Sequence, residues 1–502
     1  MWTINKSSFL LAIIAYCYIP IFIFLFGWVN YFFSVPSSLL LICLVWHFYQ
    51  EALFDKSESI KIHWSVICLI SLLLLILCAI CGYGGFVSQA SDWIKHNAIL
   101  QDLYTHAWPV IYNIDGEPAL LTYYHALYLF PALLGKIFHS PQLVEISFGI
   151  IGYIGIWLMV FSLIIVTKAN CWYKQIAVFV GFVMFSGLLF PLQKVCHVLT
   201  GDSYCNNWHA FPIGSHLLQY RSIFVMLRWV GPQCFIAWLC LILFVEYKEH
   251  IKWYSIIALP ALMSGTWAFL GLVVIMIYYL VISLIYKKYN WKEIISVSNL
   301  LPALLPGLIL VLYLLGNKVI QGNGESNNEF GLTIYHNSEW LFLFLFYIFI
   351  YGVYTITIWH HNRKDILFYA IPLSLISIPL FSIGSEIDFI MGVSIPAIVL
   401  LFIYVIQFLF ATNTSTGRGK YLFAFLKCCV IIFFILGAQY PFAEGKSIIY
   451  SKSWHLHNDY AEQTMDLCFR TGEDKRINIL WENYVNTNLD KSIYYKYISK
   501  HQ

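Results

Sequence analysis

Long apolar runs alternate with short polar connectors along most of the chain. The runs are continuous rather than alternating, and many approach the roughly 20 residues with which a helix crosses a bilayer core of about 30 Å. One of them is long enough for two helices and is broken around Ser264-Gly265-Thr266. The pattern predicts an all-α polytopic membrane protein with about 13 transmembrane helices, near 9–33, 38–54, 64–84, 144–167, 174–191, 230–246, 253–286 (two spans), 298–317, 339–358, 366–382, 391–411 and 421–440.

The connectors that carry lysine and arginine predict the orientation, because basic residues gather on the cytoplasmic side of a membrane. The first run, after Lys6, is too long for a signal-peptide core and is predicted as an uncleaved span that starts in the cytoplasm. With a cytoplasmic N-terminus, all the basic connectors lie on the cytoplasmic side only if the run 119–137 does not cross the membrane. We therefore predict that this run forms a re-entrant or interfacial helix. The basic connectors hold Lys168 and Lys174, Lys248 and Lys252, Lys287, Lys288 and Lys292, Arg363 and Lys364, and Arg418 and Lys420.

This orientation divides the chain into a transmembrane domain, residues 1–440, and an external soluble tail, residues 441–502. It also predicts four external loops, at 85–143, 192–229, 318–338 and 382–390. Composition agrees with the membrane class: 60% of the residues are hydrophobic, 11% are charged, and the mean hydropathy is +0.72. A net charge of +3 gives no basic surface for nucleic acid, so the bilayer is the expected partner.

The stretch Ser91–Tyr112 carries an unusual density of titratable side chains for such an apolar chain. Asp92 directly follows a predicted span and could deprotonate a substrate hydroxyl at the membrane surface. The alternative is that Asp92 only caps an interfacial helix. Transporters place functional charges inside their spans, whereas here the spans are almost free of charge. The pattern therefore favours chemistry at the external surface over transport.

Four basic side chains in two external loops are candidates for binding a phosphate or diphosphate group. They are Lys95, His96, Arg221 and Arg228. For any one of them, contact with lipid headgroups is the ordinary alternative. Trp93, Trp108 and Trp229 are candidates for stacking on a sugar, although tryptophan is enriched at membrane interfaces in any case.

Motifs for cofactors and metals are missing from the sequence. It holds no P-loop, GxSxG or GxGxxG motif, and His455 and His457 form a pair without a third ligand. We therefore expect no cofactor; a divalent metal stays an open alternative without a supporting motif. Cys196 and Cys205 lie in one polar loop and could form a disulfide if that loop faces an oxidising compartment.

Several segments, in order from residue 84 onward, resemble one family. DWIKHNAILQDL followed by WPVIY and YYHALYLFPALLGK is similar to the first external loop of the GT-C superfamily of polytopic glycosyltransferases, in particular its bacterial members. LRWVGPQCFIAWL (Leu227 to Leu239), EIDFIMGVSIPAIVLL (Glu386 to Leu401) and the ending SIYYKYISK resemble later segments of the same set. The chain departs from that pattern at Gly392, where a basic residue is expected, and at Cys234, where a histidine is usual.

The resemblance implies an enzyme of the bacterial inner membrane that transfers a sugar from a polyprenyl-phosphate-linked donor at the periplasmic face. The acceptor would be a glycan, a lipid or a protein, and Asp92 matches the acidic residue of the first external loop. Further substrate contacts are expected from the three tryptophans and from His106, Gln233, Glu386 and Asp388. Two other classes stay open: a surface-polysaccharide polymerase or ligase of O-antigen type, and a polysaccharide or lipid flippase or exporter.

Overall fold

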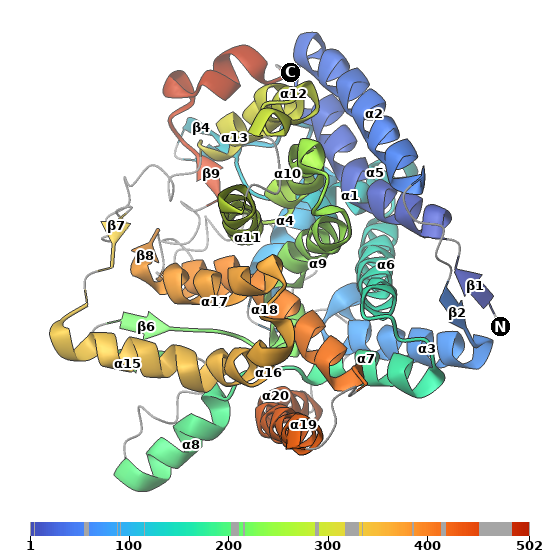
Figure 1. The fold of residues 1–502 in the computed structure, drawn as a ribbon. Coiled ribbons are helices and arrows are strands. Elements are labelled where there is room, and N and C mark those ends of the chain that lie inside the picture. The colour runs from blue at the N-terminus through green and yellow to red at the C-terminus, as the bar shows by residue number, and fades with distance from the viewer. Residues whose placement is uncertain are drawn as a thin grey trace.

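The chain forms a bundle of apolar helices with a few very short strands at its ends (Figure 1). The computed structural model describes residues 2–4, 6–54, 60–87, 89–90, 92–114, 116–201, 210–213, 216–286, 291–316, 331–333, 335–383, 386–412, 418–450 and 484–500. The helices are α1 (Lys6–Trp28), α2 (Tyr31–Phe54), α3 (Trp64–Ile80), α4 (Trp93–Thr105), α5 (Ala126–Phe138), α6 (Pro141–Val166), α7 (Trp172–Met184), α8 (Leu189–Thr200), α9 (Ile223–Tyr247), α10 (Tyr254–Ser264), α11 (Thr266–Ile285), α12 (Val297–Pro302), α13 (Leu308–Leu314), α15 (Asn337–Tyr347), α16 (Val353–Asn362), α17 (Ile366–Ser377), α18 (Glu386–Phe410), α19 (Arg418–Gly437) and α20 (Gln439–Tyr450).

The strands form four small antiparallel sheets. They are β1 (Trp2–Ile4) with β2 (Ile60–Ile62), β5 (Phe211–Ile213) with β6 (His216–Leu218), β7 (Gly331–Leu332) with β8 (Phe381–Ser382), and the three-stranded sheet β3 (Ile111–Ile114), β4 (Glu117–Leu121) and β9 (Val485–Asn486). In the three-stranded sheet Leu120 pairs with Asn486 and Leu121 pairs with Val485. This sheet joins the polar stretch after α4 to the end of the chain.

The apolar runs form helices, as the sequence predicts. In the described residues nine helices are long and apolar enough to cross a membrane, and α7 with α8 forms a tenth such segment, bent by 51°. Four shorter apolar helices lie at 64–80, 126–138, 251–264 and 366–380. The predicted break between two spans is confirmed at Gly265, which separates α10 from α11. The class of all-α polytopic membrane protein is thus supported, while the number of 13 crossings stays a prediction.

The helices differ strongly in how much of their surface the rest of the protein covers. All of the most apolar part of α18 is buried, and 83% of that of α9, so these two helices form the core of the bundle. By contrast only 11% of the most apolar part of the helix Gly419–Tyr450, which comprises α19 and α20, is buried. Figure 1 shows α19 and α20 end-on at the margin of the bundle, and α8 projecting away from it. Near its end this segment is better covered, since Tyr440, Pro441, Glu444 and Ile448 of α20 are buried.

Connectors predicted on the same side of the membrane contact one another. Among those predicted as cytoplasmic, β1 pairs with β2, Lys252 lies 2.9 Å from Glu51, and Lys248 lies 3.5 Å from Asp365. Among those predicted as external, β7 in the loop 318–338 pairs with β8, which leads into the loop 382–390. The first loop pairs with the tail through β4 and β9. The predicted loops thus gather at two separate ends of the bundle, and which end faces the cell exterior stays a prediction.

Three predicted segments have more structure than the sequence suggests. The run 119–137 begins as strand β4 and becomes helical only at Ala126. The loop 192–229 contains most of α8, a short hairpin and the first turns of α9. The tail 441–502 begins as helix α20, and its residues 484–500 pack back onto the bundle, where the Lys500 backbone N–H donates to the Trp28 carbonyl at 2.9 Å.

Candidate functional site

A glycine-rich turn after α3 sets the direction of α4. Gly82, Gly84 and Gly85 all have positive φ angles, which other residues adopt only with strain. Between them Tyr83 enters the core, where its ring meets the Trp93 ring edge-on at 4.9 Å. A Cβ at Gly82 would lie 3.0 Å from the Trp93 ring. The turn therefore allows the first residue of α4 to pack tightly, and this fixes the position of Asp92 just before it.

Asp92 precedes α4 but does not cap it. Its side chain makes no capping hydrogen bond to the helix. The carboxylate faces Lys95, with Oδ2 at 3.6 Å from the ammonium nitrogen, and the side chains of Asp92 and Lys95 are 34% and 27% exposed. The geometry thus disfavours the structural alternative of a helix cap and leaves a carboxylate with access to solvent.

Two residues from distant parts of the chain complete the surroundings of Lys95. Burial by itself lowers the pKa of Lys95, but Tyr484, Asp92 and Asp388 outweigh it, so the pKa lies well above its usual value. Burial raises the pKa of Tyr484. The charge of Lys95 and its hydrogen bond act in the opposite direction without outweighing burial. Two carboxylates and one ammonium leave this cluster with a net charge of −1. We call Asp92, Lys95, Asp388 and Tyr484 the lip cluster.

Tyrosines link the lip cluster to α9. The rings of Tyr484 and Tyr123 lie 4.9 Å apart, and the Tyr123 hydroxyl donates to the Tyr124 hydroxyl. The Gln233 amide donates in turn to the same Tyr124 oxygen. A Cβ at Gly265 would lie 3.0 Å from the Gln233 Cβ, so the break between α10 and α11 packs directly against this glutamine. The predicted substrate residue Gln233 is thus connected to the lip cluster.

An apolar groove of about 290 Å³ runs along α10 and α11 from this break. Its walls near the break are Leu262 and Phe269, and Tyr254 and Ser255 line its other end. α10 has 11 residues, which corresponds to a length of about 16 Å in a helix. The remaining lining residues are Ala258, Leu259, Val273, Met276, Ile277, Leu280, Pro302, Ala303, Gly307 and Val311. A groove of this length and character suits an aliphatic chain.

A second charged cluster surrounds the arginines predicted to bind phosphate. The Arg228 Nε lies 3.3 Å from the Glu444 carboxylate, and these side chains are 10% and 6% exposed. The Trp229 indole N–H donates to the same Glu444 oxygen at 3.0 Å. The Arg221 guanidinium lies over the Trp229 ring at 5.2 Å. We call Arg221, Arg228, Trp229 and Glu444 the arginine cluster; two guanidinium groups and one carboxylate give it a net charge of +1.

Trp93 and His96 lie in the packing between the two clusters. The Trp93 indole N–H donates to the Arg228 carbonyl at 2.8 Å, and its ring is buried rather than open to a sugar. His96 is fully buried, and its Nδ1 lies 2.6 Å from the Tyr128 hydroxyl. Burial, followed by the charge of Lys95, lowers the pKa of His96 to about 3. A neutral, buried imidazole does not suit the phosphate-binding role predicted for it.

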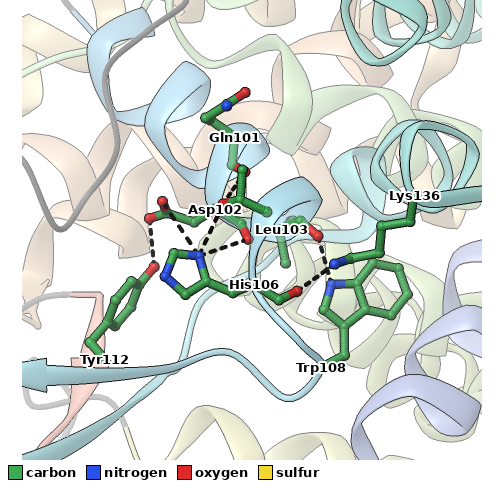
Figure 2. Close-up of polar contacts among 8 residues, drawn as sticks. Gln101, Asp102, Leu103, His106, Trp108, Tyr112 and Lys136 are labelled. Carbon is green, nitrogen blue, oxygen red and sulfur yellow. Dashed lines mark hydrogen bonds and ion pairs between the residues drawn. The ribbon is translucent and has the colours of Figure 1, made fainter. Parts of the chain in front are cut away.

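The other end of α4 forms a separate network (Figure 2). The Tyr112 hydroxyl donates to the Asp102 carboxylate at 2.8 Å, and the His106 Nδ1 lies 4.0 Å from the same carboxylate. The Trp108 indole N–H donates to the Leu103 carbonyl at 2.8 Å. In a helix, the 14 residues from Asp92 to His106 span about 20 Å. His106 and Trp108, both predicted substrate residues, therefore belong to the contact between α4 and the β3–β4 hairpin and not to the lip cluster.

The acidic residues at the start of α18 have different surroundings. Asp388 belongs to the lip cluster, whereas Glu386 lies 3.0 Å from the His216 Nδ1 and accepts the Leu217 backbone N–H at 3.1 Å. Glu386 thus holds the β5–β6 hairpin. One turn after Asp388 on α18, a Cβ at Gly392 would lie 2.5 Å from the Trp267 Cβ. The packing of α11 against α18 leaves no room for the basic side chain expected there.

Tyr124, Tyr484 and Glu444 lie in or beside the clusters and were not predicted. No local signal marks Tyr484 or Glu444, because each reaches its cluster only through the folding of the C-terminal part. Within the described ranges no three histidine, cysteine or acidic side chains come together as a metal site. Cys205, the Cys196 side chain, His455, His457 and most of the loop 318–338 lie outside the described residues.

Comparison with known proteins gives no match for this chain among protein-family models, curated proteins or solved structures.

Proposed function

We propose that this protein is a membrane glycosyltransferase that moves a sugar from a polyprenyl-phosphate-linked donor to an acceptor hydroxyl. The observation that carries the proposal is the series of contacts through Tyr123, Tyr124 and Gln233 that joins the lip cluster to the break between α10 and α11, close to one end of an apolar groove. Asp92 offers a partly exposed carboxylate beside the protonated Lys95, and Gln233 connects this cluster to the helix break where the groove ends. A lipid chain in the groove would bring its phosphate and sugar to these side chains.

In the proposed reaction Asp92 accepts the proton of the acceptor hydroxyl as its oxygen attacks the anomeric carbon of the donor sugar. The bond from that carbon to the phosphate oxygen breaks, a glycosidic bond forms, and the polyprenyl phosphate leaves with the electron pair. Lys95 remains cationic beside Asp92 and is placed to offset the negative charge that develops on the leaving phosphate. Asp388 and Tyr484 lie where they would orient the sugar or the acceptor. We place the reaction at the periplasmic face of a bacterial inner membrane.

The product tests this proposal. Purified protein in liposomes would receive polyprenyl phosphates that carry radiolabelled sugars, together with a membrane extract as the source of acceptor. We expect an acceptor that gains one sugar and the release of polyprenyl phosphate in equal amount, both absent with Asp92→Asn protein. Long chains of repeat units would indicate a polymerase. Movement of the labelled lipid across the bilayer without a new glycosidic bond would indicate a flippase. Either result would overturn the proposal.

A further inference from the structure

The arginine cluster contains more positive charge than its own carboxylate can balance. Arg228 is nine-tenths buried, and in the described part of the chain only Glu444 opposes the two guanidinium groups. The Nε and Nη1 atoms of Arg221 and the Nη1 atom of Arg228 are buried without a hydrogen-bond partner among the described residues. A buried charge without a counter-charge is strongly unfavourable, and so is a buried donor without an acceptor. The cluster therefore has the composition of a site for an additional anion.

The place of the cluster in the membrane indicates which anion it meets. The helix that carries Glu444 starts at Gly419 and has 32 residues, about 48 Å, which exceeds a bilayer core of about 30 Å. Glu444 lies 25 residues from that start, about 38 Å along the helix, so a helix that enters the bilayer core near Gly419 brings Glu444 to the level of the lipid headgroups. Phosphate esters are the abundant anions at this level, and guanidinium groups bind them with matched geometry.

Glu444 already occupies part of this site. Its Oε1 atom receives both the Trp229 indole N–H and the nearest nitrogen of Arg228, as one oxygen of a phosphate group would. The hydroxyl-bearing Tyr440, one turn earlier on α20, also lies close to the charges of Arg221 and Glu444. α20 supplies Glu444 at the end of the long helix whose most apolar part, in α19, is the least covered among the described helices. The Glu444 side chain can leave the arginines without disrupting the core formed by α9 and α18.

We propose that Arg221 and Arg228 form a phosphate-binding site in which the Glu444 carboxylate stands in for the ligand and is displaced by it. The inference rests on the proposed function only for the identity of the phosphate, which comes from the lipid-linked substrate or from a phospholipid headgroup. The site adjoins the lip cluster, since the Trp93 indole N–H donates to the Arg228 carbonyl and His96 interacts with both Lys95 and the Trp229 backbone. Glu444 thus acts as an internal competitor that holds the arginines when no phosphate is bound.

Binding without turnover tests this inference. Farnesyl monophosphate would be titrated by calorimetry into the full-length protein in detergent, and into protein in nanodiscs with and without phosphatidylglycerol. We expect Glu444→Gln to bind farnesyl phosphate at least about 10-fold more tightly, because the competing charge is gone. The Glu444→Gln protein should also melt at a lower temperature without ligand and recover its stability when the ligand is added. If phosphatidylglycerol abolishes the gain, the headgroup is the source of the phosphate; if it does not, the lipid-linked substrate is.

Glu386→Gln is the matched control, because Glu386 is also a carboxylate paired with a basic side chain but lies in another cluster. It should leave the affinity for farnesyl phosphate unchanged. Trp229→Phe removes one hydrogen bond to Glu444 and retains the charges, so it should tighten binding by about 2- to 10-fold even if Glu444→Gln does not fold. Unchanged or weaker binding in both variants would overturn the inference. If the wild-type protein transfers sugar but neither variant binds farnesyl phosphate more tightly, only this inference is contradicted. If the variants bind it more tightly but the wild-type protein transfers no sugar, only the proposed function is contradicted.

Discussion

The lip cluster and the arginine cluster lie on either side of the first turn of α4, yet they differ in charge and in exposure. The lip cluster has a net charge of −1, and Asp92 and Lys95 are about one-third exposed. The arginine cluster has a net charge of +1, and Arg228 and Glu444 are almost fully buried. An accessible carboxylate can exchange protons with a substrate, whereas a buried excess of positive charge holds an anion. The comparison therefore supports the proposals of proton transfer in one cluster and anion binding in the other.

Removal of one cation from each cluster should give the largest contrast. Arg228→Met leaves the buried Glu444 carboxylate without its partner, and we expect the free energy of unfolding to fall by about 3–5 kcal/mol. Lys95→Met removes a partly exposed ion pair and should change the same quantity by less than about 1 kcal/mol. Titration of sodium dodecyl sulfate into mixed micelles would measure both.

A double variant controls this comparison. Arg228→Met combined with Glu444→Met replaces the whole buried pair by apolar side chains and should recover most of the lost stability. In the same series Lys95→Met should lower the kcat/KM for sugar transfer by about 10- to 100-fold, the range expected for a lost hydrogen bond to a charged group. Equal losses of stability in the two single variants would show that the clusters do not differ in burial as described.

The imidazole between the clusters should make stability depend on pH. Burial holds the pKa of His96 at about 3 in the folded protein, against about 6.5 in an unfolded chain. Below pH 6.5 the unfolded chain takes up a proton that folded His96 does not, so stability is lost as the pH falls from 6.5 toward 3. The slope is about 1.4 kcal/mol per pH unit, or about 2 kcal/mol at pH 5.

His96→Asn should remove this part of the pH dependence, as measured by unfolding at a series of pH values. His139→Asn is the control, because His139 is exposed and its left-handed backbone is one that asparagine tolerates. An unchanged slope in His96→Asn would mean that His96 is not held neutral between the clusters.

The smallest expected effect concerns the contribution of the C-terminal part to the lip cluster. Tyr484→Phe removes the hydroxyl beside Lys95 and should lower kcat/KM by about 2- to 10-fold, with little change in stability. Tyr494→Phe is the matched variant, because its hydroxyl donates to the Trp28 carbonyl at 3.0 Å, away from Lys95. Tyr494→Phe should lower stability and leave kcat/KM unchanged. The reverse pattern would make Tyr484 a packing residue only.

The hydrophobic pattern predicts the helices well, because each apolar run needs only its own residues to form a helix in a membrane. It also locates the break at Gly265 and the helix that follows Asp92. The polar stretch after α3 is sufficient to single out Asp92 and Lys95, which are neighbours in sequence. The fold class and the two neighbouring members of the lip cluster could thus be predicted from local features, and Asp388 is also among the predicted substrate residues, but without its contact to Lys95.

The remaining contacts depend on how the helices are arranged, which no local pattern encodes. Glu444 reaches Trp229 across 215 residues, and Tyr484 reaches Lys95 only because β9 pairs with β4. The same limit explains the residues placed elsewhere than expected. Tryptophans such as Trp93 and Trp108 are common at membrane interfaces. Here their indole N–H groups donate to backbone carbonyls of the protein instead. Sequence identifies such side chains without showing which way they face.

The turnover of Asp92→Asn protein tests the central claim most directly. In a single-turnover assay with saturating lipid-linked donor, we expect the rate of sugar transfer to fall by about 10²–10⁴-fold, the usual contribution of a general base. The dissociation constant for farnesyl phosphate should stay within about threefold of the wild-type value, because the arginine cluster is unchanged. A transfer rate close to that of the wild type, at equal protein concentration, would contradict the assignment of Asp92 as the base.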